Sequence, residues 1–241
     1  TYIASLISRK PYVAKVPGDF VWERARNNGF TEKSVQEFQN IRLPLKYKLL
    51  RSIFTASLNK STAVIVTSNY LANFCINWGI PKDKIHLIRN AVSSSKFQFN
   101  IDKKKDIDVL CVSRLMVLKG INEVIKVCAE LSLKLVIAGS GPELKNLQLL
   151  ATELACDVTF LGDVEQEKLP DLYSRSHFFV LNSQFESTSH ALVEARLVGV
   201  FCISNLGTGS DEIIKHLFDG LLCGDANNLS LKEALIYGIN N

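Results

Sequence analysis

Two positively charged side chains and two carboxylates stand out because each follows a short apolar segment of the chain. Arg114 and Lys119 follow one such segment, and Glu186 and Glu194 follow another. Guanidinium and ammonium groups near helix starts suit a diphosphate, to which they donate charge-assisted hydrogen bonds. Carboxylates instead accept hydrogen bonds from hydroxyl groups, such as those of a sugar or a ribose. The four side chains therefore indicate a ligand that combines phosphate with hydroxyl groups.

The elements that must position these side chains alternate between short apolar runs and segments with helical spacing. Buried strands that alternate with helices indicate a parallel sheet covered on both faces, and therefore an α/β fold. We expect strands at residues 108–113, 133–138, 158–161, 177–181 and 201–204, and helices at residues 121–131, 142–155, 168–176, 190–198 and 211–216.

Loops after the expected strands collect glycines, hydroxyl groups and charges. In an open parallel sheet the ligand lies beyond the carboxyl ends of the strands, so these loops converge with Arg114 and Lys119 at one edge. Further candidates at this edge are Gly139, Gly141, Gly162, Asp163, Val164, Ser187, Thr188, Ser189 and His190.

The front half of the chain contains fewer elements. Strands are expected at residues 12–16, 63–67 and 84–88, and helices at residues 45–58 and 69–78. Residue 1 is Thr, and residues 1–9 resemble the tail of a helix, so we expect the first domain to be incomplete. The segment 94–105 is poor in apolar residues and carries K-K-K-D, which is typical of a linker. We therefore predict a partial domain at 1–93, a linker at 94–105 and a second domain at 106–241.

Composition and charge limit the class of protein. The chain has 241 residues, of which 47% are apolar and 22% charged, as in a soluble globular protein without a membrane-spanning segment. Its six cysteines are scattered, which argues against a disulfide framework or a zinc site. Residues 1–100 carry 15 basic and 5 acidic side chains, a net charge of +10, whereas the remainder carries −6. The basic half fits either an anionic partner or a merely solvated surface.

Several motifs resemble a known family. They are V-S-R-L-M-V-L-K-G (112–120), A-G-S-G-P-E (138–143), F-L-G-D-V (160–164) and E-S-T-S-H-A-L-V-E-A (186–195), with weaker matches at 16–26, 68–81 and 84–92. Together they resemble retaining glycosyltransferases of family four (group 1), of the bacterial cell-envelope type. The resemblance implies a GT-B architecture, in which two Rossmann-like domains face a cleft.

The resemblance also implies a role for each candidate. Arg114 and Lys119 would hold the diphosphate of a nucleotide-diphosphate sugar and stabilise the leaving group, while Glu186 would contact the sugar and Glu194 the ribose. The backbone near Gly162–Val164 would flank the base, Ser187–His190 would lie by the phosphates and sugar, and Gly139 and Gly141 would also bind the donor. The family pattern has Gly at position 187 and often at 189, where this chain has Ser.

Three alternatives to this interpretation come from the same residues. Asp106 and Asp108 form a D-x-D motif, but it precedes its strand and therefore lies at the edge opposite the site, so we predict no metal and no cofactor beyond the sugar nucleotide. A nicotinamide-dependent oxidoreductase could use Gly139, Gly141 and Asp163, although Leu144 replaces the third glycine of that fingerprint. A sugar-nucleotide-binding protein without catalytic activity is the third possibility.

The basic front half also suggests partners. A glycan or lipid-linked acceptor is expected, and no nucleic acid, because recognition-helix and aromatic β-surface signatures are absent from the sequence. The segment 45–58 mixes apolar residues with Lys46, Lys48 and Arg51, as in a helix that lies on anionic lipid, unless its apolar side chains face the domain's own core. We expect a cytoplasmic protein that binds the inner face of the membrane. Asp19, with Glu23, Arg24 and Arg26, is interpreted as a surface ion cluster rather than an acceptor site.

Overall fold

The computed structural model describes residues 5, 8–98, 103–224 and 229–241. The chain divides into two compact units, Thr1–Asn90 (unit 1) and Ala91–Asn241 (unit 2), and each is described by itself. The expected helix tail at residues 1–9 and the middle of the expected linker lie partly outside the described residues.

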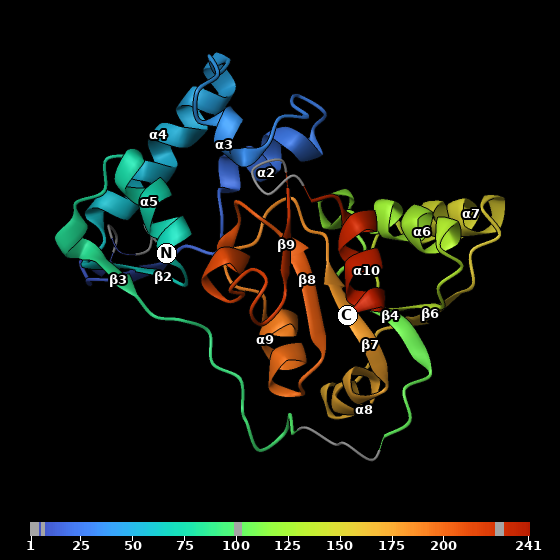
Figure 1. Ribbon diagram of the computed structural model, residues 1–241. Coiled ribbons are helices and arrows are strands. Elements are labelled where there is room, and N and C mark those ends of the chain that lie inside the picture. Colours follow the sequence, from blue (N-terminus) through green and yellow to red (C-terminus); the bar gives the residue numbers. More distant parts are fainter. Residues whose placement is uncertain (1–4, 6–7, 99–102, 225–228) are drawn as a thin grey trace. The chain divides into compact units, whose positions relative to one another are not determined.

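A parallel sheet organises unit 2 (Figure 1). The spatial order is β6-β5-β4-β7-β8-β9, so the chain fills one half of the sheet outward from β4 and then the other half outward from β7. Ligands of such sheets bind where this order reverses, at the carboxyl ends of the two central strands. The strands are β4 (Ile107–Val112), β5 (Leu135–Ala138), β6 (Val158–Gly162), β7 (Ser176–Leu181), β8 (Phe201–Asn205) and β9 (Leu221–Cys223).

Helices cover both faces of this sheet, as the alternating pattern predicts. Helices α6 (Ile121–Glu130), α7 (Leu144–Glu153) and α10 (Leu231–Asn240) pack over one apolar core. The opposite face packs against α8 (Leu169–Ser174) and α9 (His190–Leu197), which form a second core around Tyr173 and Phe179. The α/β fold and the expected strands of the back half are therefore confirmed.

The region after β8 departs from the prediction. Residues 211–216 do not form the expected helix, and a short 3₁₀ turn at Gly209–Glu212 takes its place. The reason is local, because both carboxylate oxygens of Asp211 accept from the Gly207 N–H (2.9 and 3.1 Å) and hold a turn instead. Strand β9 was not predicted, since three residues are too few to show a periodic pattern. Helix α10 was also missed, although the capping box formed by Ser230 and Glu233 is a signal that could have found it.

Unit 1 contains a smaller parallel sheet with the order β1-β2-β3. Its strands, β1 (Val13–Lys15), β2 (Ala63–Val66) and β3 (Ile85–Leu87), confirm the three expected from the sequence. The two expected helices are also present, and two short ones were missed. The helices are α2 (Phe20–Asn27), α3 (Val35–Phe38), α4 (Leu45–Lys60) and α5 (Asn69–Asn77).

A buried ion pair holds the helices of unit 1 together. The Asp19 side chain is fully buried, caps α2 through the N–H groups of Val21 and Trp22, and pairs with Arg51 of α4 at 2.8 Å. The Arg51 guanidinium lies 4.9 Å from the centre of the Trp78 ring, and Asp19 also accepts from Gln39 (2.9 Å). The interpretation of Asp19 as part of a surface cluster was wrong, because Arg51, which is distant in sequence, neutralises it inside the core.

Candidate functional site

The candidate site of unit 2 begins at the point where the strand order reverses. The 3₁₀ turn Val117–Lys119, which follows β4, is fastened to the loop after β7 by a hydrogen bond from Gln184 N–H to the Leu118 carbonyl (2.9 Å). Gly120 ends that turn with φ +61°, and the Asn182 side chain donates to its carbonyl (3.0 Å). A Cβ on Gly120 would lie 2.4 Å from the Asn182 carbonyl oxygen, so only glycine allows this approach.

This fastening brings two predicted catalytic residues together. The Lys119 ammonium forms an ion pair with the Glu186 carboxylate across the two central loops, and the two side chains are 23% and 12% exposed. Arg114 lies on the same loop as Lys119 but is exposed, and its side chain has no ion-pair or hydrogen-bond partner in the part of the chain that the structure describes. One cation of the predicted diphosphate site is thus engaged and the other is open to solvent.

Gly139 and Gly141 keep the loop after β5 close to the loop that carries Arg114. A Cβ would lie 1.9 Å from the Ser113 carbonyl oxygen at Gly139, and 2.3 Å from the Leu115 carbonyl oxygen at Gly141. Leu115 N–H also donates to the Ser140 carbonyl (2.8 Å). Both glycines therefore have a packing reason that is independent of any ligand.

The end of β6 continues this edge. Gly139 N–H donates to the Gly162 carbonyl (2.7 Å), and the Ser140 hydroxyl donates to Asp163 (2.6 Å). A cavity of about 580 Å³ follows, lined in part by Asp163 and Val164. Asp163 and Val164, two of the three residues predicted to flank the base, thus border a hollow of the surface.

The start of α9 carries the Ser-Thr-Ser-His segment. Ser189 caps the helix by accepting from Leu192 N–H (3.3 Å), and His190 is exposed at the first helical position. The Thr188 hydroxyl donates to the Ser187 carbonyl (2.8 Å). Ser187 lies against Gly209, because a Cβ added to Gly209 would lie 1.8 Å from the Ser187 carbonyl oxygen. The serine at the usual glycine position 189 therefore has a use as a helix cap.

Glu194 is the most buried of the predicted side chains, at 5% exposure. Its carboxylate accepts a hydrogen bond from the Tyr173 hydroxyl of α8 (3.0 Å). Burial, together with the negative charge of Glu194, raises the pKa of Tyr173 well above its usual range. The hydroxyl therefore stays protonated and keeps Glu194 oriented.

Sequence reasoning missed Asn182 and Tyr173, which hold the site residues in place, and two serines at strand ends. The hydroxyl oxygens of Ser113 and Ser183 are buried and have no hydrogen-bond partner among the described residues. Leaving a buried hydroxyl unsatisfied costs about 1–3 kcal/mol. The signal that could have found them is their position one and two residues after the central strands β4 and β7.

Asp106 and Asp108 lie at the amino end of β4, as predicted, on the edge opposite the site. Asp106 forms a two-point contact with Arg175 (2.7 and 2.8 Å), and Asp108 accepts from Lys134 N–H (2.8 Å). Within the described ranges, His, Cys, Asp and Glu side chains form no group of three or more that could hold a metal ion. Among the helices of the described chain, none combines the length and the hydropathy that a membrane span requires.

Comparison with known proteins defines the class. The model of the family "Glycosyl transferases group 1" matches residues 93–241, and that of "Glycosyltransferase Family 4" matches residues 9–96. The chain belongs to the group 1 glycosyltransferase family.

Individual relatives agree with this family assignment. An uncharacterized glycosyltransferase of Methanocaldococcus jannaschii is 29% identical over 72% of this chain and 50% of its own length. The N-acetyl-alpha-D-glucosaminyl L-malate synthase of Bacillus anthracis is 26% identical over 75% of this chain and 51% of its own. The chain therefore spans about half the length of these curated relatives.

A solved structure supports the fold. Anabaena HepE in complex with UDP and glucose superimposes with a TM-score of 0.79 at 19% identity, covering 100% of this chain and 65% of that one. The fold is thus that of GT-B glycosyltransferases, as predicted.

Proposed function

We propose that the protein transfers a sugar from a nucleotide-diphosphate sugar to a glycan or lipid-linked acceptor, with retention of the anomeric configuration. The observation that carries this proposal is the Lys119–Glu186 pair at the strand-order reversal, beside the solvent-open Arg114. Cations for a diphosphate and a carboxylate for sugar hydroxyls lie on adjoining loops there. HepE, a protein of the same fold, is described in complex with UDP and glucose, which supports this class of donor.

The proposed chemistry follows from the charges. The bond between the anomeric carbon and the diphosphate oxygen breaks, and the acceptor oxygen forms its new bond on the same face of the sugar. The acceptor proton leaves with the diphosphate. Arg114 and Lys119 stabilise the charge that develops on the departing diphosphate. Glu186 orients the sugar hydroxyls, and Glu194, held by Tyr173, accepts from the ribose.

We propose no role for a bound metal or nicotinamide. Asp106 is already neutralised by Arg175 at the opposite edge of the sheet. The dinucleotide alternative needs a glycine at position 144, and the chain has a leucine there. These observations favour the sugar-nucleotide interpretation over the oxidoreductase.

Direct binding tests the proposal. Isothermal titration calorimetry of the 241-residue chain with UDP, GDP and NAD should show binding of UDP or GDP but not of NAD. Arg114→Ala should weaken nucleotide binding about tenfold or more, because a hydrogen bond to a charged group contributes about 1.5–3 kcal/mol. Lys126→Ala, which removes an exposed cation from α6, is the matched control. Equal affinities of the Arg114 variant and the parent would contradict the placement of the site.

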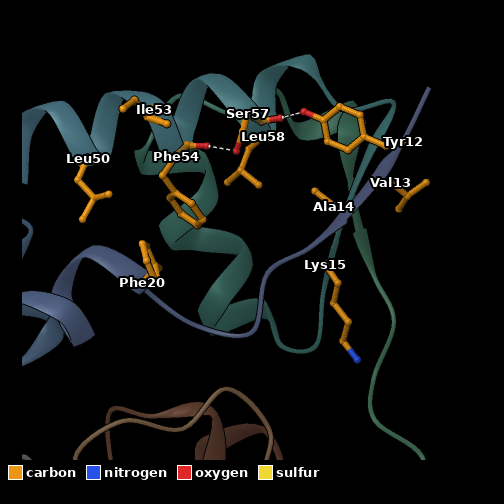
Figure 2. A pocket seen from close by; sticks show the side chains of 10 residues that line it. All are labelled: Tyr12, Val13, Ala14, Lys15, Phe20, Leu50, Ile53, Phe54, Ser57 and Leu58. Carbon is orange, nitrogen blue, oxygen red and sulfur yellow. Dashed lines mark hydrogen bonds between the residues drawn. The ribbon is translucent and has the colours of Figure 1, made fainter. Parts of the chain in front are cut away.

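We further propose that α4 places the enzyme on an anionic membrane surface. Its inward side chains Leu50, Phe54 and Leu58 line a pocket of about 470 Å³ against β1 (Figure 2). Ile53 lies at the edge of this pocket and is 54% exposed, whereas Leu45 and Leu49 lie outside it and are 83% and 59% exposed. The alternative that the apolar side chains of the helix face the core therefore holds for Leu50, Phe54 and Leu58 but not for Leu45 and Leu49.

The charges of α4 support lipid as the occupant of this outward face. Lys46 and Lys48 are exposed on either side of the apolar stripe, and the helix contains no Asp or Glu. Arg51, which was expected among the lipid contacts, is instead paired with Asp19, and its side chain is only 16% exposed. An apolar stripe flanked by lysines suits an interface with anionic headgroups, at about 1 kcal/mol for each lysine near the surface.

Vesicle co-sedimentation tests the membrane proposal. Binding should increase with phosphatidylserine content, decrease at high salt, and decrease in Leu49→Glu and in Lys46→Gln/Lys48→Gln. Lys82→Gln removes an exposed cation elsewhere in unit 1 and should bind like the parent. Binding that ignores lipid charge, or self-association that Leu49→Glu abolishes in the absence of lipid, would contradict the proposal.

A further inference from the structure

The Lys119–Glu186 pair is more than a meeting of two predicted site residues. Each side chain is the other's only side-chain partner among the described residues, and both remain partly exposed. Arg114, on the same loop, has no such partner. One cation of the proposed diphosphate site is therefore paired with a carboxylate and the other is not.

We infer that Glu186 competes with the diphosphate for Lys119, and that this competition distinguishes the donor from the spent nucleotide. The inference rests on the proposed function. When a complete sugar nucleotide binds, the sugar hydroxyls hydrogen-bond to Glu186 and Lys119 turns to the phosphates. After transfer the sugar has left, the ion pair between Glu186 and Lys119 forms again, and the free nucleoside diphosphate is held mainly by Arg114.

The backbone allows such an exchange without moving the loops. The turn that carries Lys119 is fastened to the loop after β7 by the Gln184–Leu118 hydrogen bond and by Asn182 on Gly120. The Gly209 N–H donates a hydrogen bond to the backbone carbonyl of Glu186 (2.8 Å), which holds the Glu186 backbone in place. Both Cα positions are thus fixed by contacts other than the ion pair, so rotation of the lysine stem suffices to change partners.

A merely structural ion pair leads to the opposite expectation. If the pair served to hold the two loops, its loss would loosen the site and weaken every ligand. If Glu186 competes for Lys119, its neutralisation frees a cation and strengthens the binding of a ligand that has phosphates but no sugar. A gain of affinity is a result that damage to the fold does not produce.

Calorimetry with inorganic pyrophosphate, UDP and GDP separates the two cases. Glu186→Gln should bind pyrophosphate, and whichever nucleotide the parent binds, about fivefold more tightly, as expected when a partly buried ion pair no longer has to be broken. In Glu186→Gln/Lys119→Ala the gain should disappear, because the freed cation is absent. Glu130→Gln removes a carboxylate from the far end of α6, where it pairs with Lys232 (2.9 Å), and should show no gain.

The outcomes also separate this inference from the proposed function. If Arg114→Ala weakens nucleotide binding while Glu186→Gln binds no more tightly than the parent, the site stands and the competition is refuted. If Glu130→Gln gains as much affinity as Glu186→Gln, the effect is one of net charge and the competition is again refuted. If neither the parent nor any variant binds pyrophosphate, UDP or GDP, both the proposed function and the inference fail.

Discussion

Each unit of the molecule contains an ion pair that joins segments far apart in the sequence, and the two pairs differ in how completely they are satisfied. In unit 1, Asp19 is fully buried and accepts from two backbone N–H groups, from Gln39 and from Arg51. In unit 2, the Glu186 side chain has Lys119 as its one side-chain partner in the described part of the chain, and both are partly exposed.

This contrast separates charges that hold the fold from charges that are available to a ligand. A carboxylate with several fixed donors inside a core cannot change partners without a large cost, because its charge would be left without compensation. A pair with a single contact at the carboxyl edge of a sheet can exchange that contact for a ligand. The degree of burial and the number of partners, rather than the presence of an ion pair, thus separate the framework of unit 1 from the site of unit 2.

The largest expected effect would come from breaking the pair in unit 1. Asp19→Ala removes the cap of α2 and leaves the Arg51 charge buried, so the free energy of unfolding of unit 1 should fall by about 3–5 kcal/mol. Urea unfolding followed by tryptophan fluorescence reports on unit 1, because the two tryptophans of the chain, Trp22 and Trp78, both lie there.

Two further variants sharpen this first test. Asp19→Asn retains an N-cap oxygen but loses the charge, so its loss of stability should be smaller than that of Asp19→Ala. Glu186→Gln should leave the fluorescence transition where it is, since its pair lies in unit 2. An Asp19→Ala transition that coincides with that of the parent would show that the buried pair does not stabilise unit 1.

A smaller effect is expected from a single methyl group at the site of unit 2. In Gly141→Ala the new Cβ would meet the Leu115 carbonyl oxygen at 2.3 Å, so the loop that carries Arg114 has to shift. Nucleotide affinity should fall about tenfold, as for loss of the Arg114 contact itself. Gly29→Ala, at a glycine with nothing within 4 Å of the added Cβ, is a control for a methyl in open space, although its φ of +69° adds some strain. A Gly141 variant with parental affinity would show that Arg114 does not contact the phosphates.

The sequence predicts a strand or a site residue well when neighbouring residues determine it, and poorly when contacts with distant segments determine it. Strands β4 to β8 of unit 2 are short apolar runs, a local pattern, and the structure confirms them, whereas β9 is too short to show such a pattern. The edge at which Arg114, Lys119 and Glu186 lie follows from the rule for parallel sheets, so the proximity of Lys119 and Glu186 could be expected from the sequence.

The rest depends on contacts between distant segments. Nothing near Asp19 indicates that Arg51, on a different helix, neutralises it, and nothing near Glu194 indicates Tyr173. The 3₁₀ turn after β8 was misread as a helix because the Asp211 carboxylate binds the backbone N–H of Gly207. The partners of these polar side chains are distant in sequence and are set by the fold, so a local sequence pattern does not reveal them.

The smallest expected effect concerns a third pair, Asp106–Arg175, at the amino edge of the same sheet. Its hydrogen bonds from Arg175 hold the pKa of Asp106 below its ordinary value of 3.8. Because the folded state then holds this proton less tightly than the unfolded state, the pair stabilises unit 2 above that ordinary value. The contribution is lost as the pH falls through the lower, folded pKa.

Asp106→Asn should therefore unfold slightly more easily than the parent at pH 7, and the two proteins should converge in acid, as the pH falls below the ordinary pKa of Asp106. Urea unfolding followed by circular dichroism at a series of pH values measures this difference. The effect is small because both partners are solvent-accessible, at 36% and 40% exposure, and water screens their attraction. A difference that persists unchanged in acid would show that Asp106 acts through its shape rather than its charge. The pair would then belong with neither the buried framework of unit 1 nor the exchangeable contact at the site.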